Sequence, residues 1–266
     1  MSQAPPFADI HCHLLPGIDD GADDWHQALA MARMAVDDGI ATIIATPHQL
    51  GRYAGNRGAA IRQRAAQFQE TLARLGLPLT VLPGADVRIE PEMVRRLRSG
   101  DVLSLADHRR HVLLELPHDL FLPLDGLLAE LRAAGTVGIL SHPERNLGIL
   151  RRPEVLAHLV EAGCLLQVTA GSLVGRFGPE IQKFARWMVG EGLIHFVATD
   201  AHGVRRRRPE MTRAFDCVAE LAGWQMAVEL CCSNPASVAG GRPVTAAPAA
   251  RQRSGWSGWF RRRRAG

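Results

Sequence analysis

The sequence predicts an α/β protein built on parallel strands, and three observations support this fold class. Short apolar or β-branched runs alternate along the chain with longer segments of helical periodicity. The 266 residues are enough for one α/β barrel, so a second globular domain is not required. The sequence also has no internal repeat. We expect seven strands in a closed or nearly closed (β/α) barrel, although an open doubly wound sheet fits the same pattern.

Each element follows from its local pattern. The seven expected strands are short apolar runs at Phe7–Ile10, Ala41–Ala45, Leu79–Leu82, His111–Leu114, Val137–Leu140, Cys164–Val168 and His195–Ala198. The expected helices are Trp25–Asp37, Ala59–Leu75, Leu124–Ala134, Pro153–Glu161, Pro179–Gly190 and Pro209–Leu221. Gly39 and Gly76 follow two of these helices, as is typical of helix ends, while Pro153 and Pro179 stand where a first-turn proline is tolerated.

The composition is that of a globular body followed by a basic tail. Hydrophobic residues make up 47% and charged residues 22%, with no apolar run of about 18 residues. The N-terminus lacks the features of a signal peptide, and the five cysteines have no framework spacing, so we expect reduced thiols and a cytoplasmic location. We assign residues 1–238 to one domain and residues 239–266 to a flexible linker and a basic, aromatic tail.

The formal charge of +4 arises in that tail. Residues 251–266 hold six arginines and no acidic residue, which leaves 25 basic and 27 acidic residues in the rest of the chain. The body is therefore not expected to bind nucleic acid. Trp256, Trp259 and Phe260 beside the arginines predict a weak peripheral contact with anionic membrane at its inner face. A disordered, solubilising tail is the alternative.

Histidines and carboxylates follow six of the seven expected strands. In a parallel α/β barrel the active site lies at the carboxyl ends of the strands, where all the following loops meet. The first strand ends in His11 and His13, which share one face while Cys12 points to the other, and Asp19-Asp20-Gly21 follows. The later strands deliver His48, Asp86, Glu115, His142, Asp200 and His202.

This set of imidazole and carboxylate groups predicts a site for divalent metal ions. Such ligands suit Mn²⁺, Fe²⁺, Zn²⁺ or Co²⁺. About nine candidate ligands are too many for one ion, so we expect two or three ions a few ångströms apart. A single histidine is more often a structural residue than a metal ligand. A hydrophobic core, however, does not need a charged residue after each of several successive strands, so the combined pattern indicates a site. Without cations, such buried carboxylates would repel one another.

The same segments resemble the polymerase-and-histidinol-phosphatase superfamily, and within it the bacterial tyrosine-protein phosphatases of capsule and exopolysaccharide synthesis. The matching stretches are Asp9–His13, Asp19–Gly21, Ala45–His48, Ser141–Asn146 and Thr199–His202. The resemblance covers residues 7–238. It implies a distorted TIM-like (β/α) barrel of seven strands and a cluster of up to three metal ions that prefers Mn²⁺. It also implies hydrolysis of phosphotyrosine, with the tail of a bacterial tyrosine kinase as the expected substrate.

The resemblance further implies how the ligands divide among the ions. His11, His13, Asp86 and Asp200 would surround one ion, and Asp20, His48 and His202 a second. The third would be held by Asp86, Glu115 and His142. Relatives usually have Glu at the position of Asp86, so the metal number or affinity is expected to differ here. Asp19 could take the place of Asp20 as a metal ligand. Asp20 is favoured, because it is the one directly followed by Gly21.

Two arginines are candidates for binding the phosphoryl group. Arg145 comes three residues after His142, and the family pattern indicates Arg207 within the run Arg205–Arg208, although any arginine of that run is in reach. The planar guanidinium group suits phosphate oxygens. A solvated surface run is the alternative interpretation of these arginines.

Other functions remain open from the sequence. The same cluster would serve a histidinol-phosphate or other small-molecule phosphatase. A different class is a non-catalytic partner that binds the kinase or a membrane without turnover, although the intact ligand set argues against it. No cysteine is followed six positions later by arginine, which excludes the cysteine-nucleophile phosphatases.

Overall fold

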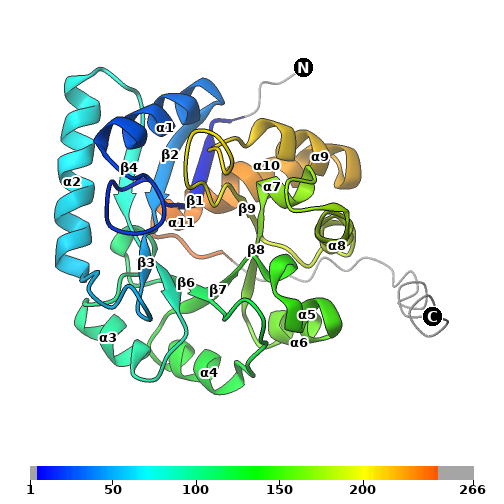
Figure 1. The fold of residues 1–266 in the computed structure, drawn as a ribbon. Helices are drawn as coiled ribbons and strands as arrows, with labels where there is room; N and C mark the ends of the chain where they lie inside the picture. The colour runs from blue at the N-terminus through cyan, green and yellow to red at the C-terminus, as the bar shows by residue number, and fades with distance from the viewer. Residues whose placement is uncertain (1–4, 245–266) are drawn as a thin grey trace.

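The structure is a computed structural model, and it describes residues 5–244. Strands alternate with helices along the chain, and the helices surround the strands (Figure 1). The strands are β1 Phe7–Cys12, β2 Ile40–Ala45, β3 His48–Gln49, β4 Thr80–Pro83, β5 Asp86–Arg88, β6 His111–Glu115, β7 Val137–Ser141, β8 Leu165–Thr169 and β9 Phe196–Ala198. The predicted α/β class with parallel strands is therefore confirmed.

The strands form two parallel sheets. One has the order β1-β2-β4 and the other β3-β5-β6-β7-β8-β9. The chain is interrupted at Thr46-Pro47 between β2 and β3, and at Gly84-Ala85 between β4 and β5. Each interruption follows the end of a predicted strand, and the short strands beyond them, β3 and β5, were not among the seven predicted. Within residues 5–244 the strands form no closed hydrogen-bonded ring, although Cys12 pairs with Ala201, just after β9, in an isolated parallel bridge.

The helices match the predicted segments closely and add several short ones. They are α1 Trp25–Asp37, α2 Gly58–Arg74, α3 Met93–Ser99, α4 Asp125–Ala133, α5 Leu147–Arg151, α6 Val155–Glu161, α7 Ala170–Leu173, α8 Pro179–Gly190, α9 Thr212–Ala222, α10 Trp224–Val228 and α11 Asn234–Ala239. The carboxylate of Asp24 accepts a hydrogen bond from the backbone of Gln27, which fixes the start of α1. The sequence did not predict α3, α5, α7, α10 or α11, which are too short to show clear periodicity.

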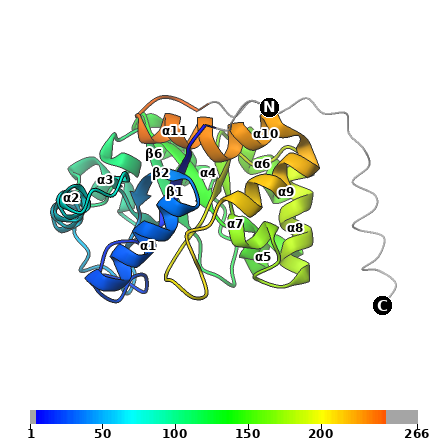
Figure 2. The same cartoon turned by 90° about the horizontal axis from the view of Figure 1, so that it is seen from above.

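An inner apolar cluster lies between the strands. Its buried members include Ile10, Ile44, Leu113, Ile139, Leu165 and Phe196, from six different strands. Val238 of α11 joins them. Figure 2 shows α11 at the side of the sheets opposite to the loops that follow β1 and β9. One end of the strands is therefore covered by a helix, and the other carries the loops with the predicted ligands.

The C-terminal tail lies outside the described residues. The last helix, α11, ends at Ala239, close to the expected end of the globular domain at residue 238. The tail of residues 251–266, for which a membrane contact is expected, is not described. Within the described chain, the helices are too short or too polar to pass through a bilayer.

Candidate metal centre

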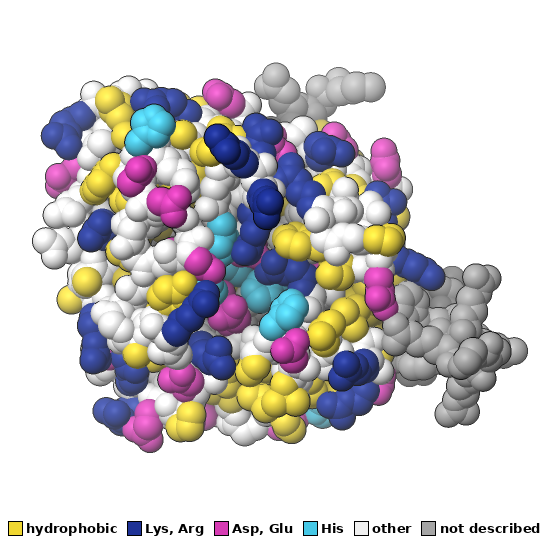
Figure 3. Space-filling model, viewed as in Figure 1, with side chains coloured by type: hydrophobic (Ala, Val, Ile, Leu, Met, Phe, Trp, Pro, Cys, Tyr) yellow, Lys and Arg dark blue, Asp and Glu magenta, His cyan; other side chains and the backbone are white. Residues whose placement is uncertain are grey.

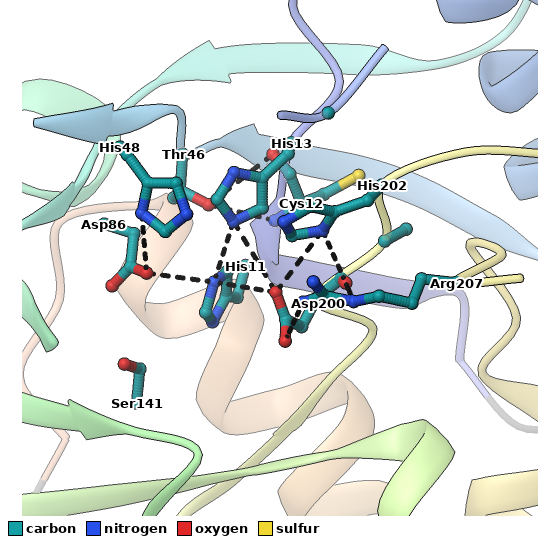
Figure 4. Close-up of polar contacts among 12 residues, drawn as sticks. His11, Cys12, His13, Thr46, His48, Asp86, Ser141, Asp200, His202 and Arg207 are labelled. Atoms are coloured by element: carbon teal, nitrogen blue, oxygen red, sulfur yellow. Dashed lines mark hydrogen bonds and ion pairs between the residues drawn. The ribbon is translucent and has the colours of Figure 1, made fainter. Parts of the chain in front are cut away.

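The nine predicted ligands converge at the loop-bearing end of the strands. They form four overlapping groups in which the candidate ligand atoms lie within 4.8 Å of one another. The groups are His13, Asp20, His48 and His202; His11, His142 and Asp200; His11, His13 and Asp86; and His48, Asp86 and Glu115. In Figure 4 the rings of His11, His13, His48 and His202 and the carboxylates of Asp86 and Asp200 face one another. Cys12 is not a member of these groups in the described chain.

Several candidate ligands lie on the same face of a strand as residues of the inner apolar cluster. On β6, Leu113 belongs to the inner apolar cluster and Glu115, two residues later, reaches the site. On β9, Phe196 and Ala198 belong to the same cluster, and Asp200 follows at the next position of that alternation. Because side chains of a strand alternate between its faces, one face supplies both the core and the ligands.

Two of the candidate ligands have left-handed backbone conformations. His142, directly after β7, has a φ of 33°, and Asp200, two residues after β9, has a φ of 50°. For residues other than glycine this conformation costs on the order of 1 kcal/mol or more and is concentrated at functional sites. The backbone thus leaves the strand direction at both points where a side chain enters the cluster.

Asp86 shows most directly that the cluster suits a cation. The residue is fully buried, and neither carboxylate oxygen has a hydrogen-bond partner within residues 5–244. The nearest histidine nitrogens, of His48 and His11, lie 3.4 and 3.6 Å from its Oδ2 atom without hydrogen-bond geometry. Burial, followed by the nearby charge of Glu115, raises the pKa of Asp86 to about 8. A buried carboxylate without donors fits a metal ion as its partner.

Neighbouring side chains orient the first two histidines. The Nδ1 atom of His11 lies 2.8 Å from Oε1 of Gln167, and Nδ1 of His13 lies 2.7 Å from Oδ2 of Asp19. Both Nε2 atoms consequently point into the cluster, 3.2 Å from each other. A histidine that ligates a metal is usually held through its other nitrogen in this way.

The structure separates the roles of Asp19 and Asp20. Asp19 contacts His13 and accepts hydrogen bonds from the backbone of Gly21 and His48. Asp20 points its Oδ1 atom at His48 and His202, at 3.3 and 3.6 Å. A Cβ atom at Gly21 would lie 2.2 Å from the carbonyl oxygen of His13, so only glycine permits this close approach. Asp20 is therefore the member of the ligand groups, as the sequence favoured.

The carboxylates dominate the electrostatics of the cluster. Burial alone would lower the pKa of His48, but its hydrogen bonds with Asp20 and Glu115 outweigh burial and raise the pKa to about 11. His11, in contrast, is fully buried, and burial lowers its pKa to about 4. The carboxylate of Asp19 likewise outweighs burial and raises the pKa of His13 to about 9. Without cations, His48 and His13 thus carry protons that balance the acidic groups, while His11 is neutral.

Arg145 and Arg207 lie beside the cluster. Both form ion pairs with the buried Oδ2 atom of Asp200, and Nε of Arg207 also donates to the carbonyl oxygen of Asp200. Burial raises the pKa of Asp200, but these two arginines and His11 reverse the effect and hold it well below its usual value. Within the run Arg205–Arg208 of the described chain, Arg207 is the arginine that pairs with a candidate ligand, whereas Arg208 pairs with Glu210.

The grouping of ligands differs from the expected division among three ions. His142 lies with His11 and Asp200, rather than with Asp86 and Glu115. His48 belongs to two groups, one with Asp20 and the other with Asp86 and Glu115. The four groups share His11, His13, His48 and Asp86, whereas the expected division shared Asp86 alone.

A family comparison agrees with this arrangement of residues. The model of the family described as capsular polysaccharide synthesis, CpsB/CapC, matches residues 7–239. The chain belongs to the CpsB/CapC family. Tyrosine-protein phosphatase YwqE of Bacillus subtilis is 44% identical over 201 residues, covering 75% of this chain and 78% of YwqE. Tyrosine-protein phosphatase CpsB of Streptococcus pneumoniae is 24% identical over 235 residues, covering 86% and 97% of the two chains.

Solved structures support the same assignment. A structure from work on YwqE of Bacillus subtilis and CpsB of Streptococcus pneumoniae, described as metal-dependent tyrosine phosphatases, matches with a TM-score of 0.87 at 38% identity. The match covers 91% of this chain and 97% of that one. The lactonase Lmo2620 from Listeria monocytogenes, with a TM-score of 0.55 at 15% identity, shares the fold alone. The predicted family resemblance is thus confirmed, and CpsB/CapC members named in these comparisons are tyrosine phosphatases.

Sequence reasoning missed several supporting residues of this CpsB/CapC site. Gln167, the middle residue of β8, had no charge or motif to mark it, yet it contacts His11. Tyr53 stacks on His48 with ring centroids 5.3 Å apart, and Arg52 lies over Tyr53 and pairs with Asp20. The available signal was a polar residue inside an otherwise apolar strand whose neighbours are followed by candidate ligands.

Proposed function

We propose that this protein is a metal-dependent tyrosine-protein phosphatase, and that its substrate is the phosphotyrosine tail of a bacterial tyrosine kinase controlling capsule or exopolysaccharide synthesis. The observation that carries the proposal is the convergence of nine histidine and carboxylate side chains beside two arginines. Membership of the CpsB/CapC family supports the reaction, because YwqE and CpsB are named tyrosine-protein phosphatases.

Two or three divalent ions, preferentially Mn²⁺, would occupy the ligand groups. The ligands are His11, His13, Asp20, His48, Asp86, Glu115, His142, Asp200 and His202. Mixed imidazole and carboxylate donors suit Mn²⁺, while Fe²⁺, Zn²⁺ and Co²⁺ also accept them. When bound, such ions activate water and neutralise phosphoryl oxygens. The unpartnered oxygens of Asp86 support a cation at the point where two groups meet.

Arg145 and Arg207 would bind the phosphoryl group of the substrate. Their guanidinium groups meet at Asp200, at the edge of the ligand groups, and arginine binds phosphate oxygens through paired hydrogen bonds. Phe177 lies against Arg145, with 4.7 Å between the guanidinium carbon and the ring centroid, which limits the freedom of that side chain. The phenolate leaving group has a pKa near 10, so its departure depends little on a general acid.

The proposal also includes the shape of the barrel and the extent of the catalytic domain. The two sheets would act together as a distorted seven-stranded barrel, with β3 extending β2 and β5 extending β4. The backbone hydrogen bond from Asp86 to Pro47, across these extensions, supports this interpretation. Residues 1–238 would form the catalytic domain, and residues 251–266 would contact anionic membrane weakly without taking part in catalysis.

The proposal is tested by comparing substrates with and without metal. The chelated protein reloaded with Mn²⁺ is offered phosphotyrosine peptides, phosphoserine peptides, histidinol phosphate and p-nitrophenyl phosphate. We expect hydrolysis of phosphotyrosine and p-nitrophenyl phosphate only after reloading, with phosphotyrosine preferred over histidinol phosphate. Preferred hydrolysis of histidinol phosphate would assign a small-molecule phosphatase. Binding of the phosphotyrosine peptide without any turnover would assign a non-catalytic partner.

A further inference from the structure

A second cavity adjoins the ligand groups at Arg207 and Thr199. Its volume is about 260 Å³, and it lies between α7 with its following turn, the loop after β9, and the start of α9. None of the nine candidate ligands lines it, and Arg145 does not line it either. The cavity is therefore a neighbour of the metal centre and not a part of it.

One part of this cavity is apolar and suits an aromatic ring. Its walls include Ala170, Val174, Phe177 and Ala214. An apolar cavity of about 150 Å³ holds a benzene ring, so this volume has room for a ring and one further group. Phe177 contacts both the cavity and Arg145, which connects the cavity to the site of reaction.

The other part of the cavity is strongly basic. Five arginines line it, and Glu210 is the one acidic residue among its lining residues. Glu210 is already paired with Arg176 and Arg208, whereas Arg206 and Arg213 have no ion pair in the described part of the chain. Figure 3 shows basic side chains gathered directly beside the histidines on this face. The excess of guanidinium groups fits an anion of high charge density such as phosphate.

The ring of the reacting phosphotyrosine has a different place available. A cavity of about 230 Å³ is lined directly by two candidate ligands, His48 and Glu115, together with Tyr53, Leu116 and Pro117. The ring of an ester bound among the ligand groups would lie next to these apolar and aromatic walls. The arginine-lined cavity therefore is not needed to hold the ring of the reacting residue.

We propose that the arginine-lined cavity binds a second phosphotyrosine of the same peptide while the first one is hydrolysed. The inference rests on the proposed function and adds to it a preference for multiply phosphorylated substrates. The aromatic ring would pack in the apolar part near Phe177, and its phosphate would be held by Arg206 and Arg213. A charge-assisted contact of this kind is strong enough to change affinity about tenfold.

The test uses the full-length protein loaded with Mn²⁺ and a set of peptides. Each peptide has one reacting phosphotyrosine and, at several spacings on either side, a tyrosine, a glutamate or a second phosphotyrosine. For at least one spacing we expect kcat/KM at the reacting position to be about tenfold higher with the second phosphotyrosine, mainly through a lower KM. Binding to the chelated protein, measured by fluorescence anisotropy, should show the same preference without turnover.

Variants separate this subsite from the metal centre. Arg213→Ala should lower the ratio of kcat/KM between the doubly and the singly phosphorylated peptide to about 1, and Arg213→Glu should bring this ratio below 1. Hydrolysis of p-nitrophenyl phosphate should stay unchanged in both variants. Arg98→Ala is the matched control, because Arg98 is also an exposed arginine on a helix without an ion pair in the described chain, and it does not line the cavity. The variant should retain the full preference.

Three outcomes would overturn the inference. They are the absence of a preference at every spacing, an equal preference for glutamate, and an unchanged preference in Arg213→Ala. In each of these cases, continued hydrolysis of the singly phosphorylated peptide leaves the proposed function intact. Loss of all phosphotyrosine hydrolysis in the Mn²⁺-loaded wild type would instead reject the proposed function itself.

Discussion

The inner apolar cluster and the candidate metal centre are built from the same strands and the loops that follow them, but have opposite physical properties. In the apolar cluster, side chains such as Leu113 and Phe196 are buried against other apolar groups, and their burial stabilises the fold. Glu115, at the end of β6, and Asp200, two residues after β9, meet other charged groups in the ligand cluster. In that region Asp86 and Gln167 retain buried polar atoms without partners. Strand alternation therefore supplies both regions. The free energy gained by burying the apolar cluster compensates for the cost of burying the polar groups of the ligand cluster.

Substitution of His11 should break the metal centre and leave the apolar cluster intact. The Nε2 atom of His11 lies 3.2 Å from the Oδ1 atom of Asp200, and the residue belongs to two ligand groups. We expect His11→Ala to lower kcat/KM for a phosphotyrosine peptide by about a thousandfold with little change in folding. His158→Ala, at an exposed histidine on α6, is the control and should keep wild-type activity. Activity above a tenth of wild type in His11→Ala would contradict the assignment.

Substitution of Leu113 should have the opposite effect. The residue is fully buried in the inner apolar cluster, two positions before Glu115. Leu113→Ala is expected to lower the free energy of unfolding by about 2–5 kcal/mol, measured with urea on the chelated protein, while kcat per folded molecule stays close to wild type. Leu221→Ala, at a partly exposed leucine of α9, should cost much less. Equal losses in the two variants would show that the inner cluster is not a main source of stability.

The contact between Asp19 and His13 tests how the polar region is held in place. Asp19 accepts from Nδ1 of His13 and so keeps Nε2 directed at the cluster. Asp19→Asn should weaken Mn²⁺ binding about 10- to 100-fold in a calorimetric titration. Asp23→Asn, four residues along the same loop, provides the control with unchanged affinity. An Asp19→Asn protein with wild-type affinity would mean that His13 needs no such support.

Proton release on metal binding is the smallest effect, and substitution of Asp86 isolates the part of it that this carboxylate contributes. Burial raises its pKa to about 8, so the metal-free protein keeps a proton on this carboxylate at neutral pH and loses it when a cation binds. At saturating Mn²⁺ and neutral pH, Asp86→Asn should release about one proton fewer than wild type, as read with a pH indicator in weak buffer. Above the pKa of Asp86 the difference should disappear. Equal release at neutral pH would show that Asp86 is already ionised.

The sequence was sufficient for the features that are encoded locally. The alternation of apolar runs and helices predicted the fold class, and the histidines and carboxylates after successive strands predicted the nine residues that the structure brings together. The breaks at Thr46-Pro47 and Gly84-Ala85 were not predicted, because the two strand fragments on either side of each break pair with different sheets. His11 contacts Gln167, and Arg145 contacts Phe177. In both pairs the partner comes from a distant segment of the chain, so only the tertiary structure determines the contact.

The converging side chains are expected to hold a cluster of divalent ions. Crystals of the full-length protein grown with MnCl₂ and measured at the manganese absorption edge test it most directly. We expect two or three anomalous peaks, each lying among the groups that contain His11, His13, His48 and Asp86. A single peak elsewhere, or no peak in the cluster at saturating Mn²⁺, would contradict the account.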